Sequence, residues 1–224
     1  MKVTYIQHSG FSVEFEDLML IFDYWTGDIT LPKDKPVYVF ASHAHHDHFN
    51  EVIFGCEREC TDIHYILSDD IEAEEAVNRR RIAPDMVCDL GNMKIKTLRS
   101  TDEGVAFFVS VKTSESEHPV TVYHAGDLNW WHWEEEDEAY NSQMKVDYQQ
   151  ALQAIEGTHV DVAFVPVDPR LEDAYYWGID WYMRHTDTAS VYPMHMWGQY
   201  EIQDRLMEQP ETAPYRDRIR KVRG

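Results

Sequence analysis

The stretch that decides the fold reads A-S-H-A-H-H-D-H-F-N and runs from Ala41 to Asn50. It places four imidazoles and one carboxylate within six consecutive residues. The apolar run Val37–Phe40 directly precedes it and is typical of a buried strand. The cluster therefore follows the end of a strand, where extended backbone directs His43 and His45 to the same side.

The side chains of this cluster are of the types that bind divalent metals. Imidazole nitrogen together with carboxylate oxygen is the donor set of zinc, and also of manganese and iron. Once the chain turns, Asp47 and His48 face a point close to the one shared by His43 and His45. The pattern therefore predicts two neighbouring metals, whereas His46 points away and is expected to be structural. A solvated histidine-rich turn that binds metal loosely is the alternative.

The motif H-x-H-x-D-H after an apolar strand resembles the signature of the metallo-β-lactamase superfamily. Further segments resemble other motifs of that family in the same order. Two of them, Tyr5–Phe11 and Ile21–Asp23, resemble the opening strands of the branch that includes the ascorbate-phosphate lactonases. Tyr123–Asp127 resembles the later glycine-aspartate element. The last two, Val160–Pro166 and Val191–His195, resemble the closing motifs, the second of which ends in a metal-ligand histidine.

The resemblance implies the fold class α/β, a four-layer αββα sandwich formed by residues 1–224 as a single metallo-β-lactamase-like domain. The sequence pattern agrees, because strands in two blocks, each followed by helices, suit two sheets between helical layers. Alternation around His8-Ser9-Gly10 predicts a hairpin, and Met144, Tyr148 and Leu152 mark one face of a helix that ends at Gly157. A capping box at Ser68 predicts a further helix that ends at the arginine run 79–81.

Carried over residue by residue, the family pattern implies two divalent metal ions, zinc first, with manganese or iron as alternatives. The implied ligands are His43 and His45 for the first metal, Asp47, His48 and His195 for the second, and Asp127 between the two. Such a pair holds a water as hydroxide and polarises the bond that it attacks. In this mechanism Asp127 also offsets part of the metal charge, and Asp47 orients the water or carries its proton.

One family ligand is missing. The segment that usually supplies another histidine to the first metal reads L-R-S-T-D-E-G here, over residues 98–104, and contains none. Asp102 is one replacement, which favours a harder metal such as manganese or iron. The others are His124, His132, or a weak first site that depends on substrate for its last ligand.

Two other residues and a group of tryptophans have two interpretations each. His8 ends a strand that the family folds beneath the site, but a hydrogen-bonded turn residue is the default. Asp23 supports the metal site in the resembled family, and a turn-forming aspartate is the alternative. Trp130, Trp131, Trp133, Trp177 and Trp197 line a pocket for an apolar substrate or belong to the core.

Composition restricts the partners. The formal net charge is −21, with 20 basic and 41 acidic residues, which disfavours binding to nucleic acid or to a membrane surface. Three cysteines cannot pair completely, and neither a membrane-spanning run nor a signal peptide is present in the sequence, so we expect a cytoplasmic protein. The expected partner is a small-molecule substrate, and the sequence does not predict the oligomeric state.

The predicted function is that of a metal-dependent hydrolase that cleaves an ester, lactone, amide or phosphodiester bond of a small molecule. A nucleic-acid phosphodiesterase is the enzymatic alternative, although no basic stripe supports it. A redox role like that of the related flavodiiron proteins is disfavoured because those proteins carry a carboxylate where His45 stands. A non-catalytic metal-binding or sensing protein with a degraded first metal site is the remaining alternative.

Overall fold

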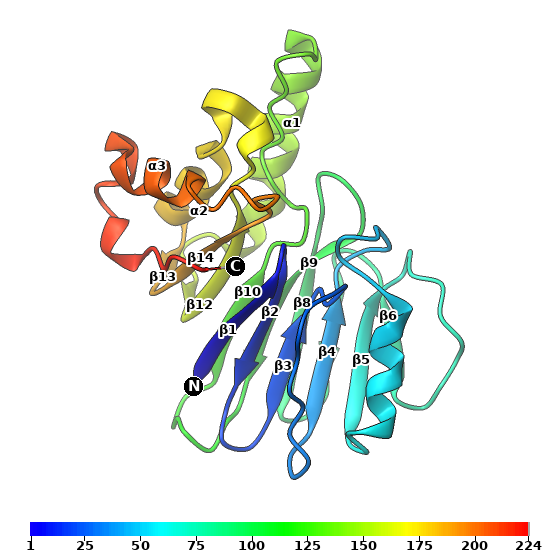
Figure 1. The fold of residues 1–224 in the computed structure, drawn as a ribbon. Helices are drawn as coiled ribbons and strands as arrows, with labels where there is room; N and C mark the ends of the chain where they lie inside the picture. The colour runs from blue at the N-terminus through cyan, green and yellow to red at the C-terminus, as the bar shows by residue number, and fades with distance from the viewer. Residues whose placement is uncertain (224) are drawn as a thin grey trace.

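Two six-stranded β-sheets pack face to face in the structure, a computed structural model that describes residues 1–223 (Figure 1). The first sheet has the strand order β1-β2-β3-β4-β5-β6, and the second has the order β14-β12-β10-β9-β8-β7. A small third sheet pairs β11 with β13.

The strands of the first sheet are β1 (Lys2–Gln7), β2 (Gly10–Glu14), β3 (Met19–Phe22), β4 (Val37–Ala41), β5 (Ile63–Ser68) and β6 (Arg79–Ile82). The remaining strands are β7 (Val87–Asp89), β8 (Met93–Arg99), β9 (Val105–Val111), β10 (Val120–His124), β11 (His159–Val160), β12 (Val162–Pro166), β13 (Asp187–Thr188) and β14 (Val191–Met194). The α-helices are α1 (Glu138–Leu152), α2 (Trp177–His185) and α3 (Ile202–Glu208). Short 3₁₀ helices span Glu51–Arg58, Gln153–Ile155, Pro169–Ala174, Pro210–Thr212 and Arg216–Arg218.

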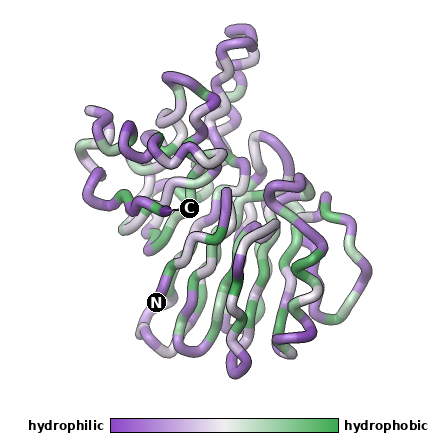
Figure 2. Tube along the Cα trace, viewed as in Figure 1, coloured by the Kyte–Doolittle hydropathy of each residue, from purple (hydrophilic) through white to green (hydrophobic). Residues whose placement is uncertain are grey.

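Aromatic side chains fill the space between the two sheets. Phe11 of β2 stacks on Phe164 of β12 with ring centroids 4.1 Å apart, and Phe40 of β4 meets Phe107 of β9 edge to face at 5.2 Å. All four side chains are fully buried, so each removes a large apolar surface from water and adds a favourable ring–ring contact. Figure 2 shows hydrophobic residues along the strands and hydrophilic ones on the outer loops.

The two outer layers differ in thickness. Helices α1 and α2 pack on the second sheet, where Tyr123 of β10 stacks on Tyr182 of α2 at 5.0 Å. On the first sheet, by contrast, the outward side chains of β4, such as Val37 and Val39, form a separate cluster with Ile53 of the 3₁₀ helix Glu51–Arg58. The predicted α/β sandwich of four layers is therefore confirmed, with one outer layer reduced to this helix and loops.

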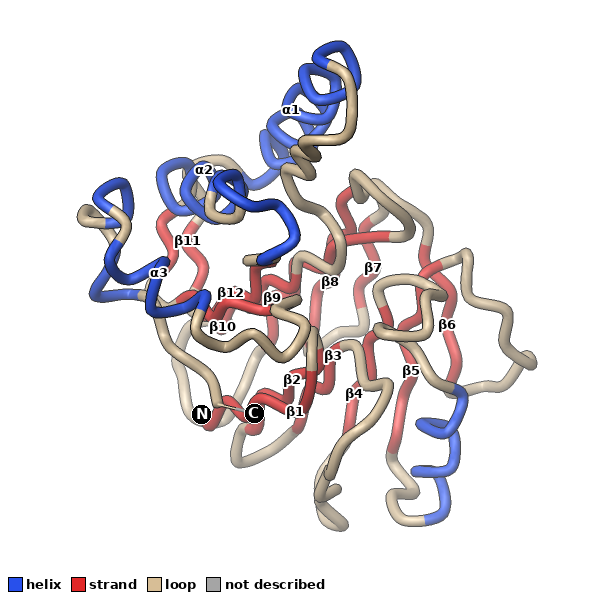
Figure 3. The backbone as a smooth tube through the Cα atoms, turned by 45° about the horizontal axis from the view of Figure 1, so that its top comes forward, coloured by secondary structure: helices blue, strands red, loops and turns tan. Residues whose placement is uncertain are grey.

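The direction of the strands determines where the functional residues gather. Strands β3, β4, β5 and β6 pair in parallel, as do β10, β12 and β14. The carboxyl ends of parallel strands meet at one edge of a sheet, and ligand sites in α/β proteins form at that edge. Figure 3, in which the top of the view in Figure 1 comes forward, shows the loops that follow these strands at this end of the molecule.

Most predicted elements are present. The chain turns at His8-Ser9 between β1 and β2, and β7 and β8 form the hairpin predicted at Gly91-Asn92. Helix α1 buries Met144, Tyr148 and Leu152 on one face, as their spacing indicates. Within residues 1–223, no helix has the length and apolar character needed to cross a bilayer. Cys56, Cys60 and Cys88 are free thiols.

The helix predicted between Ser68 and the arginine run is wrong. Residues 69–78 form turns and irregular backbone, and Arg79–Ile82 is the edge strand β6, paired in parallel with β5. The segment carries several carboxylates and little apolar periodicity, so a helix there would have no face to bury. The guanidinium of Arg79 instead lies 3.9 Å from the ring centroid of Phe54, which favours the extended pairing.

Gly104, just before β9, allows the backbone to approach the histidine cluster closely. Its φ is +67°, and an added Cβ would lie 2.0 Å from the carbonyl oxygen of Ser42 and 2.6 Å from the Cβ of His43. Gly91 has a similar φ of +87°, but no atom lies within 4 Å of an added Cβ there. We expect Gly91→Ala to lower the free energy of unfolding by about 1–2 kcal/mol, the cost of left-handed backbone.

The variant Gly104→Ala carries the same backbone cost and a clash that only a shift of residues 42 and 43 can relieve. We expect it to lose at least twice as much stability as Gly91→Ala, roughly 3 kcal/mol or more, measured by urea denaturation. Equal losses in the two variants would contradict the close packing of Gly104 against the histidine loop.

Candidate metal centre

All the side chains that the sequence predicts as metal ligands converge at the common edge of the two sheets. They come from the loops after β4, β10 and β14 and from the loop between β8 and β9. The donor atoms form three overlapping groups, and within each group the atoms lie within 4.8 Å of one another. These groups are His8, Asp47, His48 and His195; His43, His48 and Asp127; and His45, Asp102 and Asp127. His46 belongs to none of them, and its side chain is 89 % exposed.

Asp127 lies at the centre of the cluster. Its Oδ1 is 3.1 Å from Nε2 of His48 and 3.4 Å from Nε2 of His195. Its Oδ2 faces the other way and is 3.5 Å from Nε2 of His43. The carboxylate therefore has one oxygen toward each half of the cluster, which is the geometry that a bridging ligand requires.

Four buried polar atoms face one space without forming hydrogen bonds. Within residues 1–223, the Nε2 atoms of His8, His48 and His195 and Oδ1 of Asp127 have no hydrogen-bond partner. Leaving such groups unsatisfied is costly, so native proteins almost always pair them. Donor atoms around a tetrahedral zinc, each about 2.0–2.1 Å from the metal, lie about 3.3 Å apart, close to the spacings around Asp127. The residues present therefore fit a divalent metal.

Two buried carboxylates outside the cluster orient the ligand histidines. Nδ1 of His48 donates to Oδ2 of Asp23 at 2.7 Å, and Nδ1 of His195 donates to Oδ2 of Asp168 at 2.8 Å. Both aspartates are fully buried. Such a contact selects the tautomer whose Nε2 carries the free lone pair, and it increases the basicity of the ligand. Asp23 thus has the supporting position that the resemblance implies.

Asp102 is the predicted replacement that lies in the donor cluster. It shares a donor group with His45 and Asp127, and burial and the neighbouring Asp127 carboxylate raise its pKa above the ordinary value. The other two replacements lie elsewhere. His124 contacts the carbonyl of Ser9 through Nε2 at 2.8 Å, and His132 packs against Trp177 at 4.6 Å.

The charges of the cluster are strongly coupled. Burial lowers the pKa of His48, but the carboxylates of Asp127 and Asp23 outweigh burial and raise it well above its ordinary value. Burial raises the pKa of Asp127, but His48 and His195 lower it well below the usual range. Burial and the neighbouring His48 lower the pKa of His43 to about 4. In the absence of metal, the neighbouring carboxylates therefore favour the protonated form of His48, and burial favours the neutral form of His43.

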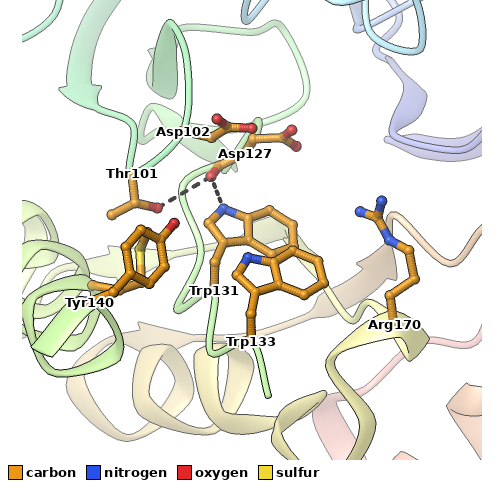
Figure 4. Close-up of a pocket in the computed structure, with 8 residues that line it drawn as sticks. Thr101, Asp102, Asp127, Trp131, Trp133, Tyr140 and Arg170 are labelled. Carbon is orange, nitrogen blue, oxygen red and sulfur yellow. Dashed lines mark hydrogen bonds between the residues drawn. The ribbon is translucent and has the colours of Figure 1, made fainter. Parts of the chain in front are cut away.

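A small cavity opens beside the cluster (Figure 4). Its volume is about 100 Å³, and its lining includes Asp102 and Asp127 on one side and aromatic side chains on the other. The indole of Trp131 donates to the carbonyl oxygen of Asp127 at 2.9 Å, which fixes it against the site. The guanidinium of Arg170 lies 5.4 Å from the ring centroid of Trp133. Of the five tryptophans for which the sequence allows either a pocket or a core position, Trp131 and Trp133 line this cavity.

Two residues of the centre are not among the ligands or supporting residues that the sequence predicts. His8 was assigned by default to a hydrogen-bonded turn, but its Nε2 lies in the donor cluster. Asp168 received no role, although it accepts hydrogen bonds from His195, Arg170 and Trp197. Its position directly after β12, a strand parallel to β14, was the available signal.

Comparison with known proteins agrees with the fold and identifies the family. The sequence model of the beta-lactamase superfamily domain matches residues 2–195, so the chain belongs to that family. A UPF0173 metal-dependent hydrolase of Desulforamulus reducens is 28% identical over 141 residues, which cover 57% of this chain and 62% of that protein. The match thus spans about three fifths of the length of this relative.

Solved structures show the same fold. A metallo hydrolase from the archaeon Ignicoccus hospitalis superposes with a TM-score of 0.59 at 18% identity, covering 98% of this chain and 94% of that one. A diiron β-hydroxylase from Streptomyces venezuelae superposes with a TM-score of 0.54 at 10% identity, covering 87% of this chain and 44% of that one.

Metal binding should release protons. The pKa of His48 is raised, so its Nε2 carries a proton at neutral pH and loses it when a metal binds. We expect zinc affinity to rise with pH until the raised pKa of His48 is passed, with at least one proton released per chain at pH 7. Calorimetric titration in buffers of different ionisation enthalpy measures this release. Affinity that does not depend on pH would contradict the assignment.

The variant Asp168→Asn should weaken metal binding without unfolding the chain. It keeps the size of the side chain but removes the charge that orients His195 through Nδ1. Loss of such a partner typically costs about 10–100-fold in metal affinity. The matched control is Asp161→Asn, which lies just before β12 at the end opposite to Asp168 and should leave the affinity unchanged. Equal affinities in the two variants would show that Asp168 has no role in the centre.

Proposed function

We propose that this protein is a hydrolase that uses two divalent metal ions, zinc first, to cleave an ester, lactone, amide or phosphodiester bond of a small molecule. The observation that carries the proposal is the set of buried, unsatisfied nitrogen and oxygen atoms around Asp127, beside a cavity. The family match and the metal-dependent hydrolase among its relatives support the same class.

The side chains have separate roles in this proposal. Bound divalent metals activate water and polarise the bond under attack. Asp127 extends one oxygen to each half of the site. Burial raises the pKa of Asp47, but His8 and His48 outweigh it and lower the pKa, so the carboxylate is ionised and accepts a proton from the attacking water. No serine or cysteine nucleophile is required.

The cavity favours a small substrate with an apolar or aromatic part. Trp133 and Tyr140 offer ring faces, Trp131 closes the cavity beside Asp127, and Arg170 is its one cationic side chain. A net charge of −21 disfavours nucleic acid as the substrate. Membership of the branch with the ascorbate-phosphate lactonases, a single domain, a cytoplasmic location and the absence of nucleic-acid or membrane partners remain our predictions.

The alternative, a non-catalytic metal-binding or sensing protein, depends on a degraded first metal site. Asp102 counts against it, because its carboxylate lies with His45 and Asp127 where a ligand is needed. Glu103 is the competing carboxylate, with Oε2 at 3.4 Å from Nε2 of His45.

Metal content distinguishes the two carboxylates. We expect about two metals per chain in protein purified without chelator, and about one in Asp102→Ala, because the first site loses an oxygen ligand. Glu103→Gln is the matched control and should retain both metals. Elemental analysis after gel filtration measures the ratio. A loss in Glu103→Gln, and not in Asp102→Ala, would assign the ligand to Glu103.

Turnover tests the catalytic proposal. Metal-loaded protein should hydrolyse at least one member of a panel of small esters, lactones, amides and phosphodiesters. Asp127→Asn should lower kcat/KM by roughly 100-fold or more, since one change affects both halves of the site. His46→Ala is the control within the same motif, and its exposed side chain should be dispensable. Full metal loading without turnover of any panel member would favour the sensing protein.

A further inference from the structure

The imidazole of His8 is held in the metal centre by a strained turn. Its φ is +54°, which is rare for a residue other than glycine and costs about 1–2 kcal/mol. The side chain is only 5% exposed. Its ring packs against His195 and Trp197, with centroids 4.2 and 4.6 Å away.

Strain of this kind concentrates at the centre. In residues 1–223, six non-glycine residues have positive φ, and four of them, His8, Asp23, His195 and Trp197, belong to the centre or contact it. Strained backbone persists where the surrounding structure fixes it, and it is found at ligand sites. Here it directs the side chain of His8 inward, away from the solvent that a residue in a hairpin turn normally faces.

The ring nitrogen of His8 has the spacing of a ligand. Nε2 is 3.3 Å from Oδ2 of Asp47, yet makes no hydrogen bond in the described part of the chain. It shares a donor group with Asp47, His48 and His195, the three side chains that the family pattern assigns to the second metal. A separation of about 3.3 Å is the edge of a tetrahedron around zinc, whose ligand distances are about 2.0–2.1 Å.

We propose that His8 is a further protein ligand of the second metal, beside Asp47, His48, His195 and the shared Asp127, an inference that rests on the metal centre of the proposed function. The second site then has three imidazoles, the carboxylate of Asp47 and a share of the Asp127 carboxylate. The first site, with His43, His45, Asp102 and the shared Asp127, has two imidazoles and two carboxylates. Imidazole suits zinc and iron, whereas carboxylate suits manganese and magnesium, so the two sites differ in chemistry and the site that contains His8 fills with zinc first.

Cobalt-substituted protein tests this ligand without any need for turnover. His8→Gly removes the imidazole, and glycine suits the positive φ of the turn. We expect its Kd for the more tightly bound metal to rise by about 100-fold or more, above the range for losing an outer hydrogen-bond partner. The visible absorption of the Co²⁺ bound at this site should change as well, and added imidazole should restore the wild-type spectrum.

Two further variants separate a ligand from a structural or positioning residue. Ser9→Ala changes the same turn and should leave the affinity and the cobalt spectrum as in the wild type. His8→Gln offers an amide N–H toward Asp47 but no imidazole nitrogen, so it should resemble His8→Gly.

Several results would overturn the inference. Wild-type affinity and spectrum in His8→Gly would show that His8 is not a ligand. Wild-type behaviour in His8→Gln, with loss in His8→Gly, would assign His8 to positioning Asp47. If His8→Gly failed to fold, judged by circular dichroism, the spectrum of His8→Gln would decide. Wild-type protein that bound no metal would refute the proposed function itself, whereas normal wild-type loading with unchanged variants would refute this inference alone.

Discussion

A single buried carboxylate, that of Asp23, holds the histidine loop in place. Its Oδ1 accepts a hydrogen bond from the backbone N–H of Ser42 at 2.7 Å, and its Oδ2 accepts from the Ser42 hydroxyl and from Nδ1 of His48, both at 2.7 Å. Burial alone would raise the pKa of Asp23, but His124 and His48 outweigh it, so the group stays ionised. One charge thus connects the ends of β3 and β4 to the ligand histidine, and a neutral side chain there would remove the charge that pairs with that histidine.

The sequence predicts those residues of the centre that lie close together in the chain or that follow strands of a known arrangement. His43, His45, Asp47 and His48 lie within six residues after an apolar strand, so backbone geometry alone brings them together. The prediction of the other ligands depends on the order of motifs along the chain and on the rule that the carboxyl ends of parallel strands meet at one edge of a sheet. Asp102 was predicted because the expected histidine was missing, and the structure brings it to His45 and Asp127.

The sequence does not predict contacts that exist only after the two sheets pack. His8 and His195 are far apart in the chain, and their rings meet because the β1–β2 turn lies against the end of β14. The same holds for Asp168, whose role depends on the neighbouring strand. The helix predicted between residues 69 and 80 is absent for another reason. A capping pattern alone does not stabilise a helix that has no apolar face to bury.

The corrected strand β6 has a consequence for how the molecule meets other chains. It forms one edge of the first sheet, so one side of its backbone lacks a neighbouring strand in that sheet. Open edges invite the strands of other molecules and are the usual starting point of aggregation. Here the edge reads Arg79-Arg80-Arg81, with the latter two side chains exposed. A strand that paired with this edge would have to desolvate the guanidinium groups and carry charges complementary to them. The arginines therefore oppose edge-to-edge aggregation of the sheet.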